Sequence, residues 1–135
     1  MASNKTFFFV IAMTLACCSV DEESIVSFEI KNGSDKMVDV KVSDLKRDWN
    51  EPLEDIVYHL SPGQDVTLFA SVGRLVPRES FITDEKLSFC SLIELSSEAK
   101  TSTKDLLLIE EWRYQRLDSR DERYSVTITA DYFNP

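Results

Sequence analysis

Short runs in which apolar and polar residues alternate recur along this chain of 135 residues. In the first of them, Val26, Phe28 and Ile30 alternate with Ser27 and Glu29. Successive side chains of a β-strand point to opposite faces of the sheet, so this alternation predicts a half-buried strand. Six further runs are predicted as strands, at residues 38–42, 56–60, 66–70, 87–95, 106–112 and 124–130.

Two of these runs depart from strict alternation. The pattern in residues 87–95 changes phase around Cys90, which is typical of a β-bulge or of burial on both faces. Residues 106–112 are apolar until Glu110 and Glu111, which indicates a central strand with Trp112 in the core.

Turn signals lie between most of the predicted strands. Asn32-Gly33 predicts a tight hairpin between the first two strands. Pro62-Gly63 fits the central positions of a type II turn. About seven short strands without a long helix predict an all-β fold, a single antiparallel two-sheet sandwich of immunoglobulin-like architecture.

The N-terminal residues follow a different pattern. Lys5 precedes residues 7–16, which are all apolar except Thr14. A helix that crosses a membrane needs about 20 such residues, so this run is too short to span one. Its length is typical of the hydrophobic region of a signal peptide, and the chain is therefore predicted to be exported.

The end of this segment, Leu15-Ala16-Cys17-Cys18, resembles the bacterial lipobox, in which a leucine and two small residues precede the cysteine that is acylated. The resemblance implies that Cys18 is the lipidation site, although Cys17 stands where glycine, alanine or serine is usual. The following segment 19–23, Ser-Val-Asp-Glu-Glu, also resembles the acidic tract that directs some Bacteroidetes lipoproteins to the cell surface. Ordinary secretion without lipid, after cleavage near Ala16 or Ser19, remains the alternative.

The whole chain is similar to the small β-sandwich lipoproteins of Bacteroidetes, mostly uncharacterised. In that family an opening strand and turn follow the acidic leader, as residues 29–34 do here, and a strand such as residues 124–128 closes the chain. The resemblance implies a signal peptide at 1–17, an acidic tether at 18–24 and a β-sandwich at 25–135. It implies a lipid anchor in the cell envelope, most simply in the outer membrane.

The charge of the chain restricts its partners. All 24 acidic residues follow Cys18, and the whole chain has a formal net charge of −9. Such a surface repels phosphate backbones, so nucleic acid is excluded as an expected partner. The excess of acidic over basic residues serves either the solubility of the protein or the binding of a cationic partner.

Few residues of the chain have the spacing that catalysis or metal binding needs. His59, the only histidine, lies on the outward phase of its predicted strand and is expected to be solvated. Cys90 is expected to be a buried small apolar residue, and it cannot form a disulfide framework alone. The acidic segment 118–123 contains two arginines and no glycine, which favours a self-paired turn over a calcium site. No cofactor, metal or enzymatic activity is therefore predicted.

A contact surface is the remaining possibility. Trp49 lies in a polar loop with Arg47, where it either closes over the sandwich or serves as a binding residue together with Arg74 of the next long loop. Tyr114 and Arg116 follow Trp112 at a spacing that places all three on one strand face.

Two functions remain open at this point. The sequence predicts a non-enzymatic envelope lipoprotein, a binding or structural module at a membrane surface with a protein or glycan partner. The alternative is an acidic inhibitor or immunity-type protein, secreted or in the envelope, that binds a cationic enzyme.

Overall fold

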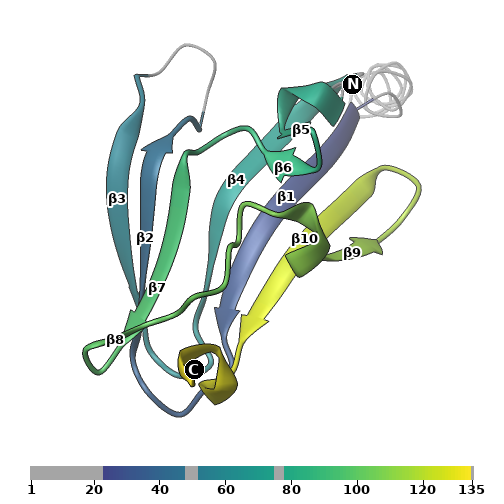
Figure 1. Cartoon of the computed structure of the whole chain (residues 1–135). Helices are drawn as coiled ribbons and strands as arrows, with labels where there is room; N and C mark the ends of the chain where they lie inside the picture. The colour runs from purple at the N-terminus through teal and green to yellow at the C-terminus, as the bar shows by residue number, and fades with distance from the viewer. Residues whose placement is uncertain (1–22, 48–51, 75–77, 135) are drawn as a thin grey trace, which may run out of the picture.

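The computed structural model describes residues 23–47, 52–74 and 78–134. Two four-stranded sheets face each other (Figure 1). The first sheet has the order β4-β1-β10-β9 and contains β1 (Glu23–Asn32), β4 (Asp65–Arg74), β9 (Arg113–Arg116) and β10 (Asp121–Ile128). The second has the order β3-β2-β7-β8 and contains β2 (Val38–Leu45), β3 (Glu54–Leu60), β7 (Leu92–Ser97) and β8 (Lys100–Thr101).

The remaining elements are short. A two-stranded hairpin is formed by β5 (Ile82–Thr83) and β6 (Lys86–Leu87). The helices of the described residues are the 3-10 turns η1 (Arg78–Ser80), η2 (Ile109–Glu111) and η3 (Ala130–Phe133). No helix in the described part of the chain is both long and apolar enough to cross a membrane.

The predicted all-β two-sheet sandwich is confirmed, with two differences. The described residues contain ten strands rather than about seven, since β5, β6, β8 and β9 have at most four residues each and are too short to produce a periodic pattern. β1 also pairs with β10 in parallel, from Ile25 opposite Asp121 to Asn32 opposite Ile128, within an otherwise antiparallel arrangement. β1 begins at Glu23, inside the segment 18–24 that was predicted as a tether.

Alternation along the strands places one row of side chains in the core, as predicted. Val26, Phe28 and Ile30 of β1 are buried, and Val38, Val40 and Val42 of β2 are fully buried opposite them. Fully burying a side chain of this size contributes about 1.5–3 kcal/mol.

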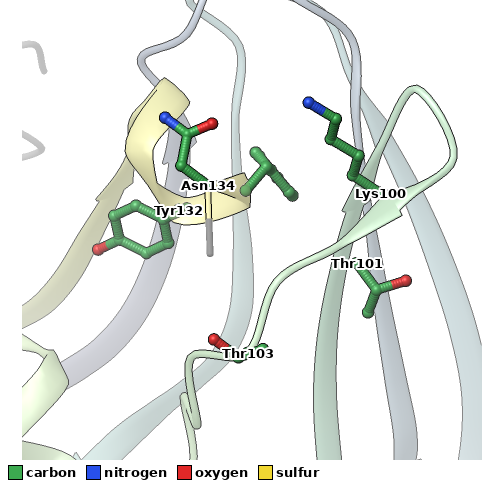
Figure 2. A pocket seen from close by; sticks show the side chains of 6 residues that line it. Lys100, Thr101, Thr103, Tyr132 and Asn134 are labelled. Atoms are coloured by element: carbon green, nitrogen blue, oxygen red, sulfur yellow. The ribbon is translucent and has the colours of Figure 1, made fainter.

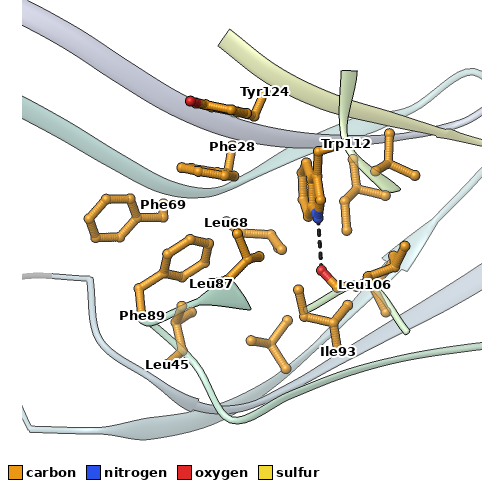
Figure 3. Close-up of a cluster of buried hydrophobic side chains, with 14 of the residues drawn as sticks. Phe28, Leu45, Leu68, Phe69, Leu87, Phe89, Ile93, Leu106, Trp112 and Tyr124 are labelled. Atoms are coloured by element: carbon orange, nitrogen blue, oxygen red, sulfur yellow. Dashed lines mark hydrogen bonds between the residues drawn. The ribbon is translucent and has the colours of Figure 1, made fainter. Parts of the chain in front are cut away.

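Aromatic rings fill the centre of the core (Figure 3). The ring of Phe28 stacks on that of Tyr124, with centroids 4.6 Å apart, and meets Trp112 edge-on at 5.3 Å. Phe69 stacks on Phe89 at 4.5 Å. Trp112 is buried as predicted, and its indole N–H donates to the carbonyl of Leu106 at 2.7 Å.

The hairpin predicted at Asn32-Gly33 is wrong, because β1 and β2 lie in different sheets. Here the chain crosses the sandwich, and the buried Asn32 side chain stabilises the crossing. Its amide donates to the carbonyls of Lys36 at 2.7 Å and Leu60 at 2.9 Å. Gly33 is required by close packing, since a Cβ there would lie 2.6 Å from Cγ2 of Thr127.

The turn predicted at Pro62-Gly63 is confirmed. Gly63 has a φ of 83°, and the N–H of Gln64 donates to the carbonyl of Ser61 at 2.9 Å. A positive φ at the third residue defines a type II turn and favours glycine there. This turn also connects the two sheets, since β3 and β4 belong to different ones.

The single strand predicted at residues 87–95 is wrong. The chain leaves β6 at Leu87 and enters β7 only at Leu92. The break coincides with an irregularity in β2, where Asp44 has a φ of 52°. Ser91 bridges the two segments, because its N–H donates to the carbonyl of Ser43 at 2.9 Å and its hydroxyl to the Asp44 carboxylate at 2.6 Å.

The strand predicted at residues 66–70 is present within β4, but its alternation of buried and exposed residues is interrupted. The pairing of β1 with β4 shifts register between Phe28 and Glu29. This bulge leaves both Leu68 and Phe69 buried and turns Ala70 toward solvent.

The central strand predicted at residues 106–112 is wrong as well. This segment contains one isolated bridge, at Leu108, and the turn η2, so that Glu110 and Glu111 lie in a 3-10 helix rather than a strand. Leu106 and Trp112 are nevertheless buried. Figure 1 shows the segment passing in front of the first sheet, where it covers the core as a loop. An apolar run predicts burial, but it does not distinguish a strand from a covering loop.

Candidate functional site

The binding residues predicted from the sequence lie at one end of the sandwich, so far as they are described. Arg47 follows β2 and is exposed, and its guanidinium lies 3.3 Å from Oε1 of Glu54 and donates to the Tyr58 hydroxyl at 2.7 Å. Arg74 ends β4 opposite Glu23. The ends of β2 and β4 lie at the same end of the molecule as the start of β1, on different sheets (Figure 1).

The other two predicted residues, Trp49 and Cys18, lie outside the described residues. Their predicted roles as a binding residue and as the lipidation site stay predictions.

A concave site with a different set of residues lies on the flank formed by β9 and β10. We call it the aromatic recess; it has a volume of about 450 Å³ and is lined by Arg78, Ile109, Trp112, Tyr114, Glu122 and Tyr124. Sites for small ligands are typically concave, lined by apolar and aromatic side chains, with a few polar groups that fix orientation. The aromatic recess has this composition.

The register of the β9–β10 hairpin builds one wall of the recess. Tyr114 of β9 pairs with Tyr124 of β10, so both rings are on the same face of the sheet, with centroids 5.1 Å apart. Two residues further, Arg116 pairs with Glu122 on that face. β9 is the edge of its sheet, and the Tyr114 side of this face is therefore exposed, with 46% of Tyr114 accessible.

The opposite wall comes from the connecting segments. η1 supplies Arg78, and η2 with the residue after it supplies Ile109 and Trp112. The bond from the Trp112 indole to the Leu106 carbonyl fixes the orientation of this ring. This wall therefore consists of connecting segments rather than of strands.

Opposite charges meet at the recess. The Tyr114 hydroxyl donates a short hydrogen bond to the Glu122 carboxylate. The pKa of Arg116 is raised by its hydrogen bond to Tyr114 and by the nearby Glu122. Burial raises the pKa of Tyr124, and the Arg78 guanidinium partly opposes this shift. At neutral pH Tyr124 therefore offers a protonated hydroxyl.

The sequence indicated only part of this site. The spacing of Tyr114 and Arg116 correctly indicated a shared strand face, whereas Trp112 precedes β9 and joins Tyr114 only in the lining of the recess. Arg78, Ile109 and Glu122 come from three separate segments, and no local pattern connects them. Only long-range pairing brings them together.

A second recess lies at the opposite end of the sandwich, between β8 and η3 (Figure 2). It has a volume of about 310 Å³ and is lined by Lys100, Thr101, Thr103, Tyr132, Phe133 and Asn134. We call it the C-terminal recess. Nζ of Lys104 lies 5.4 Å from the centroid of the Tyr132 ring, and burial raises the pKa of Tyr132.

The only histidine forms a carboxylate pair without triad geometry. Nδ1 of His59 lies 2.6 Å from Oδ1 of Asp39, and both side chains are accessible on the outer face of the second sheet. Across this sheet His59 pairs with Asp39, and Asp39 pairs with Ser96. A catalytic triad requires histidine between the acid and the hydroxyl, whereas here the acid is in the middle.

Cys90 is held in its uncharged form. Burial raises the pKa of its thiol to about 12, which a hydrogen bond to the backbone of Leu92 only partly opposes. The thiolate is the nucleophilic form of cysteine, so this side chain is inert at neutral pH.

The acidic segment 118–123 binds its own backbone. The Asp118 carboxylate accepts the N–H groups of Arg120 at 2.8 Å and Asp121 at 2.9 Å, which lower its pKa. Within the described ranges, no three His, Cys, Asp or Glu side chains are grouped closely enough to hold a metal ion.

Comparison with protein-family models, with curated proteins and with solved structures gives no match for this chain. The fold and the site alone therefore define its class. It is an all-β sandwich with an aromatic-lined recess on one flank.

Proposed function

We propose that this chain is an exported lipoprotein whose β-sandwich acts, without catalysis, as a binding module at a membrane surface. The observation that carries the proposal is the aromatic recess, in which three aromatic side chains and two opposite charges line a hollow of about 450 Å³. Aromatic side chains supply most of the binding energy in many recognition sites because they bury a large area at a small cost in side-chain entropy.

The position of β1 supports a short tether. β1 begins at Glu23, so only residues 19–22 separate it from Cys18. A fully extended chain covers at most about 3.6 Å per residue, which limits the distance from Cys18 to the sandwich to about 18 Å. An acylated Cys18 would hold the body of the protein within one molecular diameter of the bilayer.

The tether also sets an orientation. It enters at the end of the sandwich that carries the β9–β10 turn, because the N–H of Ile25 donates to the carbonyl of Arg120 at 3.2 Å. The β9–β10 hairpin and η1, which contribute to the aromatic recess, are on this half of the molecule, whereas β8 and η3, which contribute to the C-terminal recess, are at the far end (Figure 1). A membrane-anchored chain would thus hold the aromatic recess near the bilayer and the C-terminal recess away from it.

The state of the reactive side chains supports a role without catalysis. The Cys90 thiol is uncharged at neutral pH, and among the described residues no hydroxyl is paired across the sheet with His59 on the side away from Asp39. These three side chains then act as parts of the fold.

The anchor is tested by replacing Cys18 in a bacterium that processes lipoproteins. We expect the full chain to sediment with membranes, with an intact mass that lacks residues 1–17 and includes acyl chains. Cys18→Ala should move the protein to the soluble fraction, because several acyl chains together provide stable attachment. Cys90→Ala is the matched control and should stay with the membranes. A Cys18→Ala protein that remains membrane-bound, or unprocessed chain in the cytosol, would refute the anchor.

A further inference from the structure

We infer that the aromatic recess binds a neutral sugar ring, with Tyr114 as the stacking surface and Glu122, Arg78 and Tyr124 as partners for its hydroxyls. The inference rests on one part of the proposed function, that the chain is a binding module, and it does not depend on the lipid anchor. It adds the chemical class of the ligand and the residues that select it.

The first argument is the presence of an exposed ring on a rigid base. The Tyr124 ring is held by stacking on the buried Phe28 ring, with centroids 4.6 Å apart and an interplanar angle of 4°. The Tyr114 ring contacts the Tyr124 ring at an interplanar angle of 57°, and 46% of Tyr114 is exposed. Its hydroxyl donates a hydrogen bond to Glu122. The face of an aromatic ring carries partial negative charge and attracts the partially positive C–H groups that line a sugar ring. A preorganised ring binds at a smaller entropic cost.

The second argument is the set of polar groups around that ring. Glu122 accepts one hydrogen bond from Tyr114, and a carboxylate has lone pairs for about four. The exposed Arg78 contributes donors, and Tyr124 makes no side-chain hydrogen bond to the described residues, so its hydroxyl can donate or accept. Neighbouring sugar hydroxyls need donors and acceptors side by side, and the recess supplies both.

The third argument is the balance of charge. A cationic ligand would be attracted by Glu122 but repelled by Arg78 and by Arg116 beside Glu122, and an anionic ligand would meet the reverse. The net charge of −9 further disfavours polyanions. A neutral ligand with polar edges and an apolar face matches both the polar and the apolar side chains that line the recess. The volume of about 450 Å³ lies within the range of small-molecule sites.

A peptide is the competing ligand, because β9 is the edge of its sheet and is paired only with β10. A peptide could add to this edge as a further strand. The sugar is favoured because all four residues of β9 are exposed and two of them are arginines, and charged side chains protect an edge against strand addition.

The test is direct binding of the full chain, in detergent, to immobilised neutral hexasaccharides of glucose, xylose and N-acetylglucosamine. We expect at least one of them to bind, with an affinity that changes little between low and high salt, since a neutral ligand forms no ion pairs that salt would screen. Tyr114→Ala and Glu122→Gln should each weaken binding about tenfold or more, which corresponds to about 1.4 kcal/mol.

Tyr132→Ala is the matched control, since Tyr132 is a partly buried tyrosine of the C-terminal recess. It should leave binding unchanged. Urea unfolding of each variant shows whether the fold is intact, and saturation-transfer NMR identifies sugar protons that lie against aromatic rings.

Three results would overturn the inference: no hexasaccharide binds at millimolar concentration, Tyr114→Ala binds as well as the parent chain, or the site binds peptides in preference to sugars. These outcomes are separate from the test of the anchor. A chain that is acylated but binds no sugar refutes the ligand class alone, and a sugar-binding chain that is not acylated refutes the anchor alone.

Discussion

At the scale of single residues, Asn32 is the clearest case of a polar side chain that determines a connection. It is fully buried, and each of its side-chain atoms that can form hydrogen bonds does so. Its amide donates to two carbonyls, and its oxygen accepts the N–H of Ser34 at 3.0 Å and the Ser34 hydroxyl at 2.7 Å. Asn32 thus ties the end of β1 to the end of β3 in the other sheet.

Replacing Asn32 with alanine is expected to lower the free energy of unfolding by about 2–3 kcal/mol, because it removes the buried hydrogen bond to the Leu60 carbonyl and the bond to the Lys36 carbonyl. The measurement is urea unfolding followed by circular dichroism. Asn134→Ala is the control, since Asn134 is exposed, and it should change stability by less than about 0.5 kcal/mol. A loss of stability no larger than that of the control would show that the Asn32 bonds contribute little.

The same residue shows a limit of local patterns. Asn-Gly favours a tight turn in almost any context, and the dipeptide therefore predicts a hairpin whose two strands are paired in one sheet. The structure uses Asn32 for its side-chain bonds and Gly33 for its lack of a Cβ against Thr127. Both requirements involve strands distant in sequence, so the dipeptide alone could not distinguish the two arrangements.

At the scale of elements, the two tight hairpins of the described residues are built without glycine. Glu98 and Ala99 join β7 to β8 with φ values of 50° and 65°, and Asp84 and Glu85 join β5 to β6 with φ values of 54° and 63°. Two successive positive φ values define the type I′ turn, in which asparagine and glycine are preferred. These residues therefore occupy a conformation that costs about 1–2 kcal/mol for an ordinary side chain.

Ala99→Gly is expected to stabilise the protein by about 0.5–1 kcal/mol, because relief of the steric cost at φ 65° exceeds the extra entropy of the unfolded chain. Thermal unfolding measures the change. The same substitution at Ala70, an exposed residue within β4, is the control and should destabilise by about 0.5–1 kcal/mol. If both variants are destabilised equally, the β7–β8 turn is not strained.

At the scale of the whole molecule, the first and last strands are neighbours. β1 lies between β4 and β10. The Phe28 ring of β1 contacts aromatic residues of β4, of β10 and of the segments that join the sheets. Val40 and Val42 of β2 and Ile93 and Leu95 of β7 complete the same core from the other sheet. Because each sheet buries its apolar face against the other sheet and the segments that join them, neither is expected to be stable alone.

The chain is therefore expected to unfold in a single transition. In a Trp49→Phe background, fluorescence reports on Trp112 alone and should show the same urea midpoint as far-UV circular dichroism. Phe28→Ala should lower the stability seen by both probes by about 3–5 kcal/mol. Separate midpoints for the two signals would show that the sheets unfold independently.

The sequence by itself determined the class of fold and which side of most strands is buried. Alternation is a local property, and residues such as Val38, Val40 and Val42 must share a face once they form a strand. The export segment and Cys18 remain predictions from the sequence, and they concern residues that the structure does not describe.

Only the tertiary structure decided which strands are neighbours. The parallel pairing of β1 with β10, the loop made by residues 106–112 and the meeting of Arg78 with Tyr114 and Glu122 all depend on contacts between distant segments. Strand partners are selected by the free energy of packing the complete core, which no short window of sequence contains. For the same reason the aromatic recess, the site with the strongest claim to a function, appears only once the chain is folded.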